Sequence, residues 1–413
     1  MKAASIILKR KENIWQNIVL QIFQKMQTGN LTITLPNGET IVTGNTAETL
    51  QADIRITRPE FFKKCVLYGD VGFGEAYVDG DWESTNITNL ISWFLSNIDN
   101  APTISGNKLN MFSVNVLKFF NINKHFFRSN TLNGSRKNIS DHYDLNNDFF
   151  SLFLDETMTY SSAYFKEDDM PLKEAQYAKY EALCRRVKLK SSDHVLEIGT
   201  GWGGNAIYMA GKYGCRVTTT TISEEQHKMA CEKVNLAGLE DKVTVLLQDY
   251  RELKGSYDKI VSIEMLEAVG HNFLESYFMQ CHHLLKKDGL LGLQVITCPD
   301  SRYESLRGNV DWIQKYIFPG SLLPSIAAIN KAVNNTSDFT LVNLEEMGLH
   351  YAKTLRYWLE SFNSNWHGIN RLGFNDTFKR KWNYYMCYCE AAFLMRNINV
   401  MQMVYSRPNN LNM

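Results

Sequence analysis

The sequence predicts an α/β protein built on a doubly wound, mostly parallel sheet, with a small α+β domain before it. Two observations predict this class. Between residues 194 and 297, short apolar or β-branched runs alternate with helical patterns, which is typical of a parallel sheet covered by helices on both faces. A glycine cluster at residues 199–204 stands at the first strand-to-helix junction, where open α/β sheets bind their ligands.

The 413 residues have the composition of a globular protein with a sizeable core. Of these residues 44% are hydrophobic and 21% are charged, and the formal net charge is +0, which excludes disorder as the main state. No run of roughly 18 or more apolar residues occurs, so no membrane-spanning helix is expected. Eight cysteines without a CxxC pair indicate reduced thiols and no metal site.

We expect two domains, an N-terminal one of residues 1–135 and a second one of residues 136–413. Residues 31–35 alternate apolar side chains with Thr, and Asn37-Gly38 leads into residues 40–43, which predicts a β-hairpin. The glycine-rich residues 69–74 are expected to form a turn before a helical segment, because no strand-then-helix context supports a phosphate loop there.

A basic and aromatic segment follows the hairpin region. No acidic residue lies between Asp99 and Asp141, and residues 1–140 carry 15 Lys and Arg against 11 Asp and Glu. The segment contains Lys108, Lys118, Lys124, Arg128, Arg136 and Lys137, interleaved with Phe112, Phe119, Phe120, Phe126 and Phe127. This mixture suits an anionic membrane surface, and a solvated linker with packed phenylalanines explains it equally well.

The second domain is expected to hold five parallel strands, at residues 194–198, 215–221, 243–247, 257–263 and 289–297. Helices are expected at residues 205–212, from Ser223 onward, and at 273–285. Ser223, followed by Glu224 and Glu225, is a favourable helix start. Ligands are expected beyond the carboxyl ends of the strands.

The glycine cluster allows two cofactor assignments. Gly199, Gly201 and Gly204 satisfy the pattern G-x-G-x-x-G, which also occurs in dinucleotide-binding folds. Glu197, two residues before the first glycine, favours S-adenosylmethionine, because a carboxylate attracts its positive methionine end and repels a pyrophosphate. Glu224 lies about 20 residues further on, but it falls inside the expected helix and not at a strand tip.

Many segments resemble those of the cyclopropane-fatty-acyl-phospholipid synthase family of S-adenosylmethionine-dependent lipid methyltransferases. They are residues 72–82, 139–150, 154–155, 158–165, 196–204, 221–226, 248–251, 262–270, 312–320, 350–355 and 403–407. The resemblance covers nearly the whole chain. It implies a class I methyltransferase fold, Rossmann-like, with a helical insertion after the fifth strand, and it makes the N-terminal part a substrate or membrane domain.

The resemblance also implies an activity. The family transfers the methyl group of S-adenosylmethionine to a cis double bond of a phospholipid acyl chain, and ring closure to a cyclopropane follows through a carbocation and proton loss. We therefore expect a cytoplasmic enzyme that associates peripherally with the inner face of a membrane, forms a homodimer and binds no nucleic acid.

The cofactor contacts implied by the resemblance are spread over several predicted loops. They are Tyr160, Ser161, Glu197, Gly199, Gly201, Thr221, Ile222, Gln226, Asp249 and Tyr250. Tyr143 is expected either to face the reacting chain or to pack in the core. The aromatic segment 312–318 is expected either to wall the acyl tunnel or to pack as an ordinary helix, and residues 384–394 are expected in the core because their apolar residues recur at helical spacing.

In the family a bound bicarbonate is the usual base, held by a Cys, a Glu, a His and a Tyr. The Glu corresponds to Glu267 and the Tyr to Tyr351, whereas Ser162 replaces the Cys and Gln294 replaces the His. Both replacements can donate hydrogen bonds to an oxyanion, so bicarbonate remains possible. Glu267 is the alternative base if burial raises its pKa, although a Glu at such a place is ordinarily an exposed helix carboxylate.

Three alternatives stay open at this point. The same first step could give a methyl-branched or methylene chain, which the departures at Ser162 and Gln294 allow. An NAD-dependent oxidoreductase would use the glycine cluster differently. A lipid-binding protein without catalysis would not need Glu267 and Tyr351.

Overall fold

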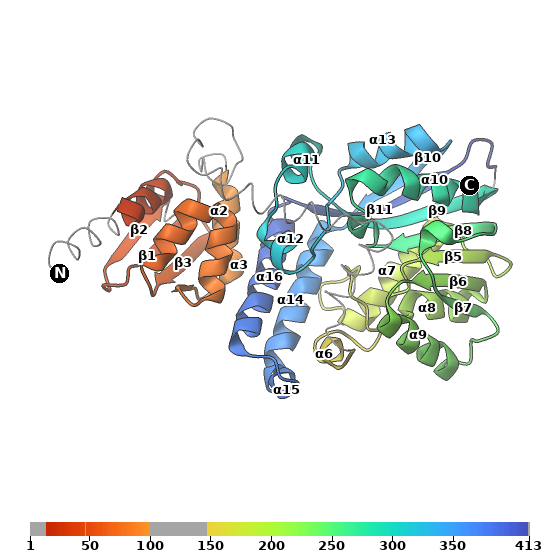
Figure 1. The fold of residues 1–413 in the computed structure, drawn as a ribbon, viewed down its shortest axis with the longest axis horizontal. Coiled ribbons are helices and arrows are strands. Elements are labelled where there is room, and N and C mark those ends of the chain that lie inside the picture. Colours follow the sequence, from red (N-terminus) through yellow and green to blue (C-terminus); the bar gives the residue numbers. More distant parts are fainter. Residues whose placement is uncertain (1–13, 46, 99–146, 412–413) are drawn as a thin grey trace. The chain divides into compact units, whose positions relative to one another are not determined.

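The computed structural model describes residues 14–45, 47–98 and 147–411, and they form two compact units (Figure 1). The first unit combines the N-terminal segment with Gly308–Ile317 and Asn370–Asn397, and the second holds the other described residues. This division differs from a single cut near residue 135, because two late segments pack with the N-terminal part. The expected boundary itself, and Tyr143, lie outside the described residues.

The first unit contains a four-stranded sheet in the order β2-β1-β3-β4. Its strands are β1 (Asn30–Thr34), β2 (Thr40–Gly44), β3 (Gln51–Ile56) and β4 (Trp82–Glu83). The hairpin prediction is confirmed, since β1 and β2 pair antiparallel with Ile33 opposite Ile41. The helices of this unit are α2 (Glu60–Val78), α3 (Ile87–Ser96), α12 (Trp312–Tyr316) and α16 (Asp376–Leu394).

The prediction of a turn at residues 69–74 that leads into a helix is confirmed in part. The chain kinks at Gly69 (φ 60°, ψ −131°), and the rest of this stretch is helical within α2. Position 74 needs glycine because a Cβ there would lie 2.5 Å from Trp312 Cδ1. The prediction that residues 384–394 belong to the core is largely confirmed, because most of their apolar side chains are buried in α16 and Leu394 is exposed.

The second unit is built on a seven-stranded sheet in the order β10-β11-β9-β8-β5-β6-β7. Its strands are β5 (His194–Ile198), β6 (Arg216–Thr221), β7 (Val243–Leu247), β8 (Tyr257–Ile263), β9 (Leu285–Thr297), β10 (Thr340–Glu346) and β11 (Asn399–Ser406). The five central strands pair in parallel, as predicted, and β11 and β10 add antiparallel strands that we did not predict. The expected doubly wound, mostly parallel sheet is thereby confirmed.

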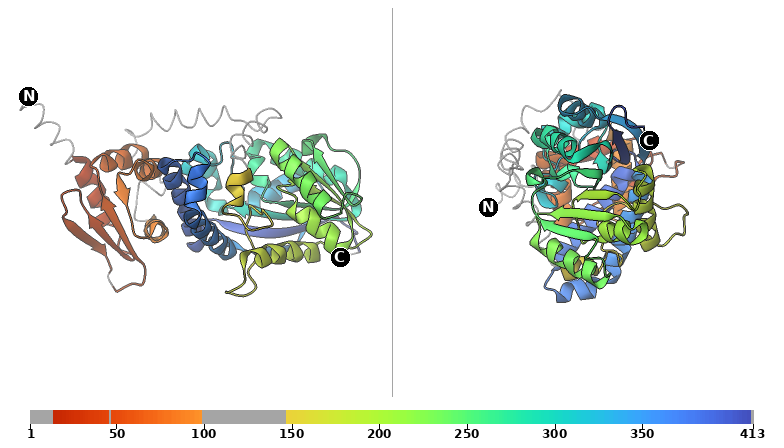
Figure 2. Two further views of the ribbon diagram at one scale, coloured as in Figure 1. Left: turned by 90° about the horizontal axis from the view of Figure 1, so that it is seen from below. Right: turned by 90° about the vertical axis from the view of Figure 1, so that its right-hand side faces the viewer.

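Helices cover both faces of this sheet (Figure 2). The helices of this unit are α6 (Asn147–Ser151), α7 (Leu172–Arg186), α8 (Gly204–Tyr213), α9 (Glu224–Leu236), α10 (Leu274–Leu284), α11 (Asp300–Arg307), α13 (Ile326–Thr336), α14 (Gly348–Ser364) and α15 (Trp366–Arg371), the last of which crosses the division between the units. This unit also contains three short 3-10 helices, η2 (Tyr250–Glu252), η3 (Leu266–Ala268) and η4 (His271–Phe273).

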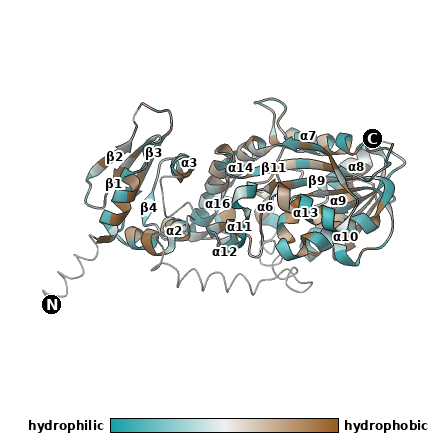
Figure 3. Cartoon of the chain, turned by 90° about the horizontal axis from the view of Figure 1, so that it is seen from above, coloured by the Kyte–Doolittle hydropathy of each residue, from teal (hydrophilic) through white to brown (hydrophobic). Residues whose placement is uncertain are grey.

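The core has two halves because successive side chains of a strand point to opposite faces. Leu196 and Ile198 of β5 join the half that contains side chains of α10 and α13. Val195, between them, joins the half that contains side chains of α7 and α8. The outer surfaces of α9 and α10 carry hydrophilic residues (Figure 3). Within the described residues, no helix has the length and apolar character needed to cross a bilayer.

Candidate active site

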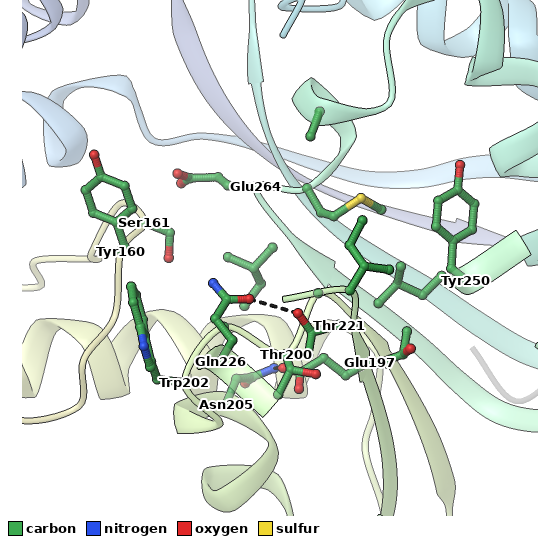
Figure 4. A pocket seen from close by; sticks show the side chains of 18 of the residues that line it. Tyr160, Ser161, Glu197, Thr200, Trp202, Asn205, Thr221, Gln226, Tyr250 and Glu264 are labelled. Atoms are coloured by element: carbon green, nitrogen blue, oxygen red, sulfur yellow. Dashed lines mark hydrogen bonds between the residues drawn. The ribbon is translucent and has the colours of Figure 1, made fainter. Parts of the chain in front are cut away.

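A pocket opens at the carboxyl ends of β5, β6 and β8 in the second unit (Figure 4). All ten residues expected to contact the cofactor line it: Tyr160, Ser161, Glu197, Gly199, Gly201, Thr221, Ile222, Gln226, Asp249 and Tyr250. Four segments of the chain supply them, three of them at the ends of β5, β6 and β7, because the strands of a parallel sheet end at the same edge. The lining also includes residues that we did not predict, among them Thr200, Trp202, Asn205, Gln248, Arg251, Glu264 and Met265.

The loop after β5 needs glycine for two reasons. Gly199 and Gly201 adopt φ values of 102° and 52°, which side-chain-bearing residues rarely adopt. A Cβ on Gly201 would meet nothing within 4 Å, so this backbone faces open space in the pocket. A ligand can therefore approach the main chain closely at this turn.

Glu197 ends β5 as a buried carboxyl group. Its two oxygens accept hydrogen bonds from Asn205 Nδ2 at 2.8 Å and from Thr219 Oγ1 at 2.6 Å. Burial raises its pKa to about 7, and the two hydrogen bonds and the charge of Lys179 act against this rise. A positively charged ligand in the pocket would favour the ionised form further.

Two polar side chains are oriented at the tips of the following strands. Thr221 Oγ1 donates to Gln226 Oε1 at 2.9 Å, which turns the amide nitrogen of Gln226 away from Thr221 (Figure 4). Asp249 is almost fully buried and forms an ion pair with Arg251 at 2.7 Å. These groups supply fixed donors and acceptors for a polar ligand.

An aromatic wall lies beside the pocket. The ring of Tyr160 lies 5.4 Å from Phe150, 5.1 Å from Trp358 and 6.5 Å from Phe318, measured between ring centroids. Phe318, the last residue of the aromatic segment 312–318, contacts Tyr160 and so belongs to this wall. Trp312 packs in the first unit, where its ring centroid lies 4.7 Å from that of Tyr384, so ordinary packing describes Trp312.

A buried polar cluster surrounds Glu264, at the end of β8. Glu264 Oε1 accepts hydrogen bonds from the Ser162 backbone N–H at 2.9 Å and from Gln294 Nε2 at 2.8 Å. Tyr351 also hydrogen-bonds to this side chain. Burial raises the pKa of Glu264, and the charge of Lys179 opposes that rise. Three of the four residues expected to hold bicarbonate are thus gathered around a carboxyl group of the chain itself.

Glu267 lies in η3, close enough to Glu264 for their charges to interact. Glu267 is buried, so its interpretation as an exposed helix carboxylate is wrong. Its Oε1 accepts from the Ile296 backbone N–H, and its Oε2 is buried without a hydrogen-bond partner among the described residues. Burial, with the charge of Glu264, raises the pKa of Glu267 to about 8.

Comparison with known proteins now decides the family. The model of the mycolic acid cyclopropane synthetase family matches residues 130–403. The chain belongs to this family. Its fold makes it an S-adenosylmethionine-dependent methyltransferase, and the alternative of an NAD-dependent oxidoreductase is therefore wrong.

Individual relatives of the cyclopropane synthetase family agree with this assignment. The chain is 38% identical over 362 residues to the cyclopropane-fatty-acyl-phospholipid synthase of Escherichia coli K12, covering 86% of this chain and 88% of that protein. It is 36% identical over 355 residues to the tuberculostearic acid methyltransferase UfaA1 of Mycobacterium tuberculosis, covering 84% and 81%. The solved structure of mycolic acid cyclopropane synthase CmaA1 with SAH and CTAB matches with a TM-score of 0.61 and 31% identity, covering 66% of this chain and 98% of that one.

The pocket of this synthetase fits S-adenosylmethionine. The buried carboxyl group of Glu197, the exposed main chain at Gly201 and the fixed amide of Gln226 are the anionic, close-approach and polar groups that a cationic, polar cofactor needs. The cofactor is S-adenosylmethionine. A dinucleotide would place a pyrophosphate near Glu197, which is unfavourable.

Two charged residues with a part in the polar cluster of this synthetase site, Lys179 and Glu264, also escaped the sequence analysis. Lys179 of α7 is fully buried and donates to Ser161 Oγ at 2.7 Å, and burial lowers its pKa. No local pattern singles it out, because α7 has several charged residues. Glu264 carries the same signal as Glu267, a Glu just after a predicted strand, and only the fold shows which of the two carboxyl groups meets Ser162 and Gln294.

Proposed function

We propose that this protein transfers the methyl group of S-adenosylmethionine to a cis double bond of a phospholipid acyl chain and that the product closes to a cyclopropane ring. The observation that carries the proposal is a cofactor pocket lined by Tyr160 of the aromatic wall and by the carboxyl group of Glu264. An alkene is a weak nucleophile, so the reaction needs a strong electrophile held close to it. When bound, S-adenosylmethionine supplies that electrophile as its methyl group.

The side chains of the pocket have separable tasks in this proposal. Glu197, Gln226 and Asp249 hold and orient the cofactor. The wall of Tyr160, Trp358 and Phe318 excludes water, which would otherwise trap a cationic chain as an alcohol. The π faces of these rings also favour positive charge near them.

The last step needs a base. Glu264, half-buried, and Glu267, buried, are carboxyl groups with raised pKa values, and such groups suit general acid–base catalysis near neutral pH. Tyr351, Gln294 and Ser162 position this end of the site through Glu264. Tyr143 remains a prediction for contact with the reacting chain.

A second product is the main alternative. UfaA1, named a tuberculostearic acid methyltransferase, is about as similar to this chain as the Escherichia coli synthase. Ser162 and Gln294, which depart from the Cys and His of the family pattern, favour considering a methyl-branched or methylene chain as well. The first chemical step is the same in both cases, and only the proton that is lost differs.

Product analysis tests the proposal. The purified protein is incubated with methyl-labelled S-adenosylmethionine and vesicles of a cis-monounsaturated phospholipid, and the chains are identified by mass spectrometry and proton NMR. High-field cyclopropane protons are expected. Label in an isomer without a ring would support the alternative product, and absence of label from every chain would refute both.

We further propose that the enzyme works peripherally at the inner face of a membrane as a cytoplasmic homodimer, with the N-terminal part as its substrate or membrane domain. The basic and aromatic residues between Asp99 and Asp141 support membrane contact. Reversing Lys118, Lys124 and Arg128 to Glu should reduce co-sedimentation with anionic vesicles at low salt, where charge attraction is least screened. Unchanged sedimentation would contradict membrane contact through this segment, and the oligomer is checked by light scattering.

A further inference from the structure

The residues that should hold a bicarbonate ion already have partners. Gln294 Nε2 has two N–H bonds, and it donates to Glu264 Oε1 at 2.8 Å and to Ser162 O at 3.2 Å. The Ser162 hydroxyl donates to Ala163 O at 3.0 Å, and Tyr351 bonds to Glu264. The donors that replace the family's Cys and His therefore do not fit a separate anion.

The charges lead to the same result. Glu267 is buried and Glu264 is half-buried, and their carboxyl groups lie within interaction range of each other. Lys179 is the cation whose charge acts on Glu264. A bicarbonate ion would add another negative charge to this buried site. Unpaired buried charge is strongly unfavourable, so this set of residues can hold the carboxylate of Glu264 or a bicarbonate in its place, but not both.

Glu264 is also aimed at the reacting region. It lines the cofactor pocket, and its carboxyl group points toward Tyr160 and Ser161 (Figure 4). Its backbone has a φ of 48°, which is unfavourable for a residue with a side chain and is typical of strain kept at functional sites. The partners described above fix the carboxyl group in this direction.

We infer that Glu264 takes the place of the family's bicarbonate and is itself the catalytic base. This inference rests on the proposed function. A C–H bond of the transferred methyl group breaks, its electron pair forms the third C–C bond of the ring, and the proton passes to a carboxylate oxygen of Glu264. The side chain leaves this step as a carboxylic acid and releases the proton to solvent before the next turnover. Bicarbonate is then not needed.

Two variants test the inference in the full-length protein. Glu264→Gln keeps the shape but cannot accept the proton, and it should lower methylenation at least about 100-fold. Glu264→Gly opens the space of one carboxyl group at a φ that glycine adopts readily. In CO₂-free buffer this variant should lose activity. Addition of bicarbonate should then raise its activity at least about tenfold. Glu240→Gln, at an exposed position, is the surface control.

Bicarbonate binding is measured separately, by ¹³C NMR of labelled bicarbonate with the SAH-bound protein. We expect binding to Glu264→Gly and none to the unchanged protein, whose turnover should not respond to bicarbonate. Binding by the unchanged protein, a severalfold rise of its turnover with bicarbonate, or full activity of Glu264→Gln would overturn the inference. If no lipid is labelled by any form, the proposed function fails, while the binding result still decides whether Glu264 fills the bicarbonate position.

Discussion

Gln294 and Glu264 share a hydrogen bond of 2.8 Å at the carboxyl ends of the neighbouring strands β9 and β8. The other end of the Gln294 amide accepts from Gln402 Nε2 of β11 at 2.9 Å. Three adjacent strands thus orient one carboxyl group through a chain of side-chain amides. Because Gln294 and Gln402 are buried and Glu264 is half-buried, each bond in this chain helps to fix the next one.

Replacing Gln294 by Leu should destabilise the protein, because Glu264 and Gln402 would each lose a buried partner. We expect the free energy of unfolding to fall by about 0.5–1.5 kcal/mol for each hydrogen bond lost. Urea denaturation measures the change. Gln24→Leu at an exposed position is the control and should change the free energy of unfolding by no more than about 0.5 kcal/mol; an equally small change for Gln294→Leu would contradict the chain.

Glu267 should make stability fall as pH rises. Its pKa is raised from the usual 4.5 to about 8 in the folded protein, so between these values the folded state keeps a proton that the unfolded chain releases. Stability is then lost at up to ~1.4 kcal/mol per pH unit over this window. Glu267→Gln removes the titration, so the difference in unfolding free energy between the two proteins should change steadily from pH 5 to pH 8. Parallel curves would mean that Glu267 is ionised in the folded state.

Gln226 should contribute to cofactor affinity without contributing to the chemical step. Its amide is oriented by Thr221 and lines the pocket, and loss of one such hydrogen bond costs roughly a factor of ten in binding. Calorimetric titration of Gln226→Ala with SAH should show this weakening. Lys228→Ala, exposed on the same helix, should bind as the unchanged protein does, and equal affinity for both variants would remove Gln226 from the cofactor site.

The sequence predicts the parallel part of the fold well because each central strand is a short apolar or β-branched run between helical patterns. It does not predict β10 or β11. β10 is an edge strand with mostly half-buried or exposed residues, and β11 is assigned by its long-range pairing with β9. The turn predicted at residues 69–74 is found only as a kink at Gly69, and the glycine at position 74 is required by contact with a residue more than 200 positions away.

The residues of the site also divide into those that could be predicted from the sequence and those that only the fold brings together. The cofactor residues could be named in advance because they lie in segments that resemble the family's motifs, and all of them line the pocket. Lys179 could not be named, because its burial arises only when α7 packs on the sheet and Ser161 comes within 2.7 Å. The sequence shows the identities of Ser162 and Gln294, but it does not show that both contact Glu264.

Gly74 gives a prediction for the first unit that is independent of catalysis. A Cβ built on it would lie 2.5 Å from Trp312 Cδ1 and 2.8 Å from Tyr384 Cε1, and both rings are buried with little room to move. Gly74→Ala should therefore overpack the contact between α2, α12 and α16 and destabilise the protein by about 1–3 kcal/mol. Gly211→Ala is the matched control, because Gly211 lies in α8 with only Leu239 near its side-chain position, at 3.8 Å. There the better helix propensity of Ala should stabilise the protein by about 0.5–1 kcal/mol. Thermal unfolding of both variants measures these changes. If SAH affinity is unchanged in both, the effect of Gly74→Ala belongs to packing in the first unit and not to the cofactor site in the second.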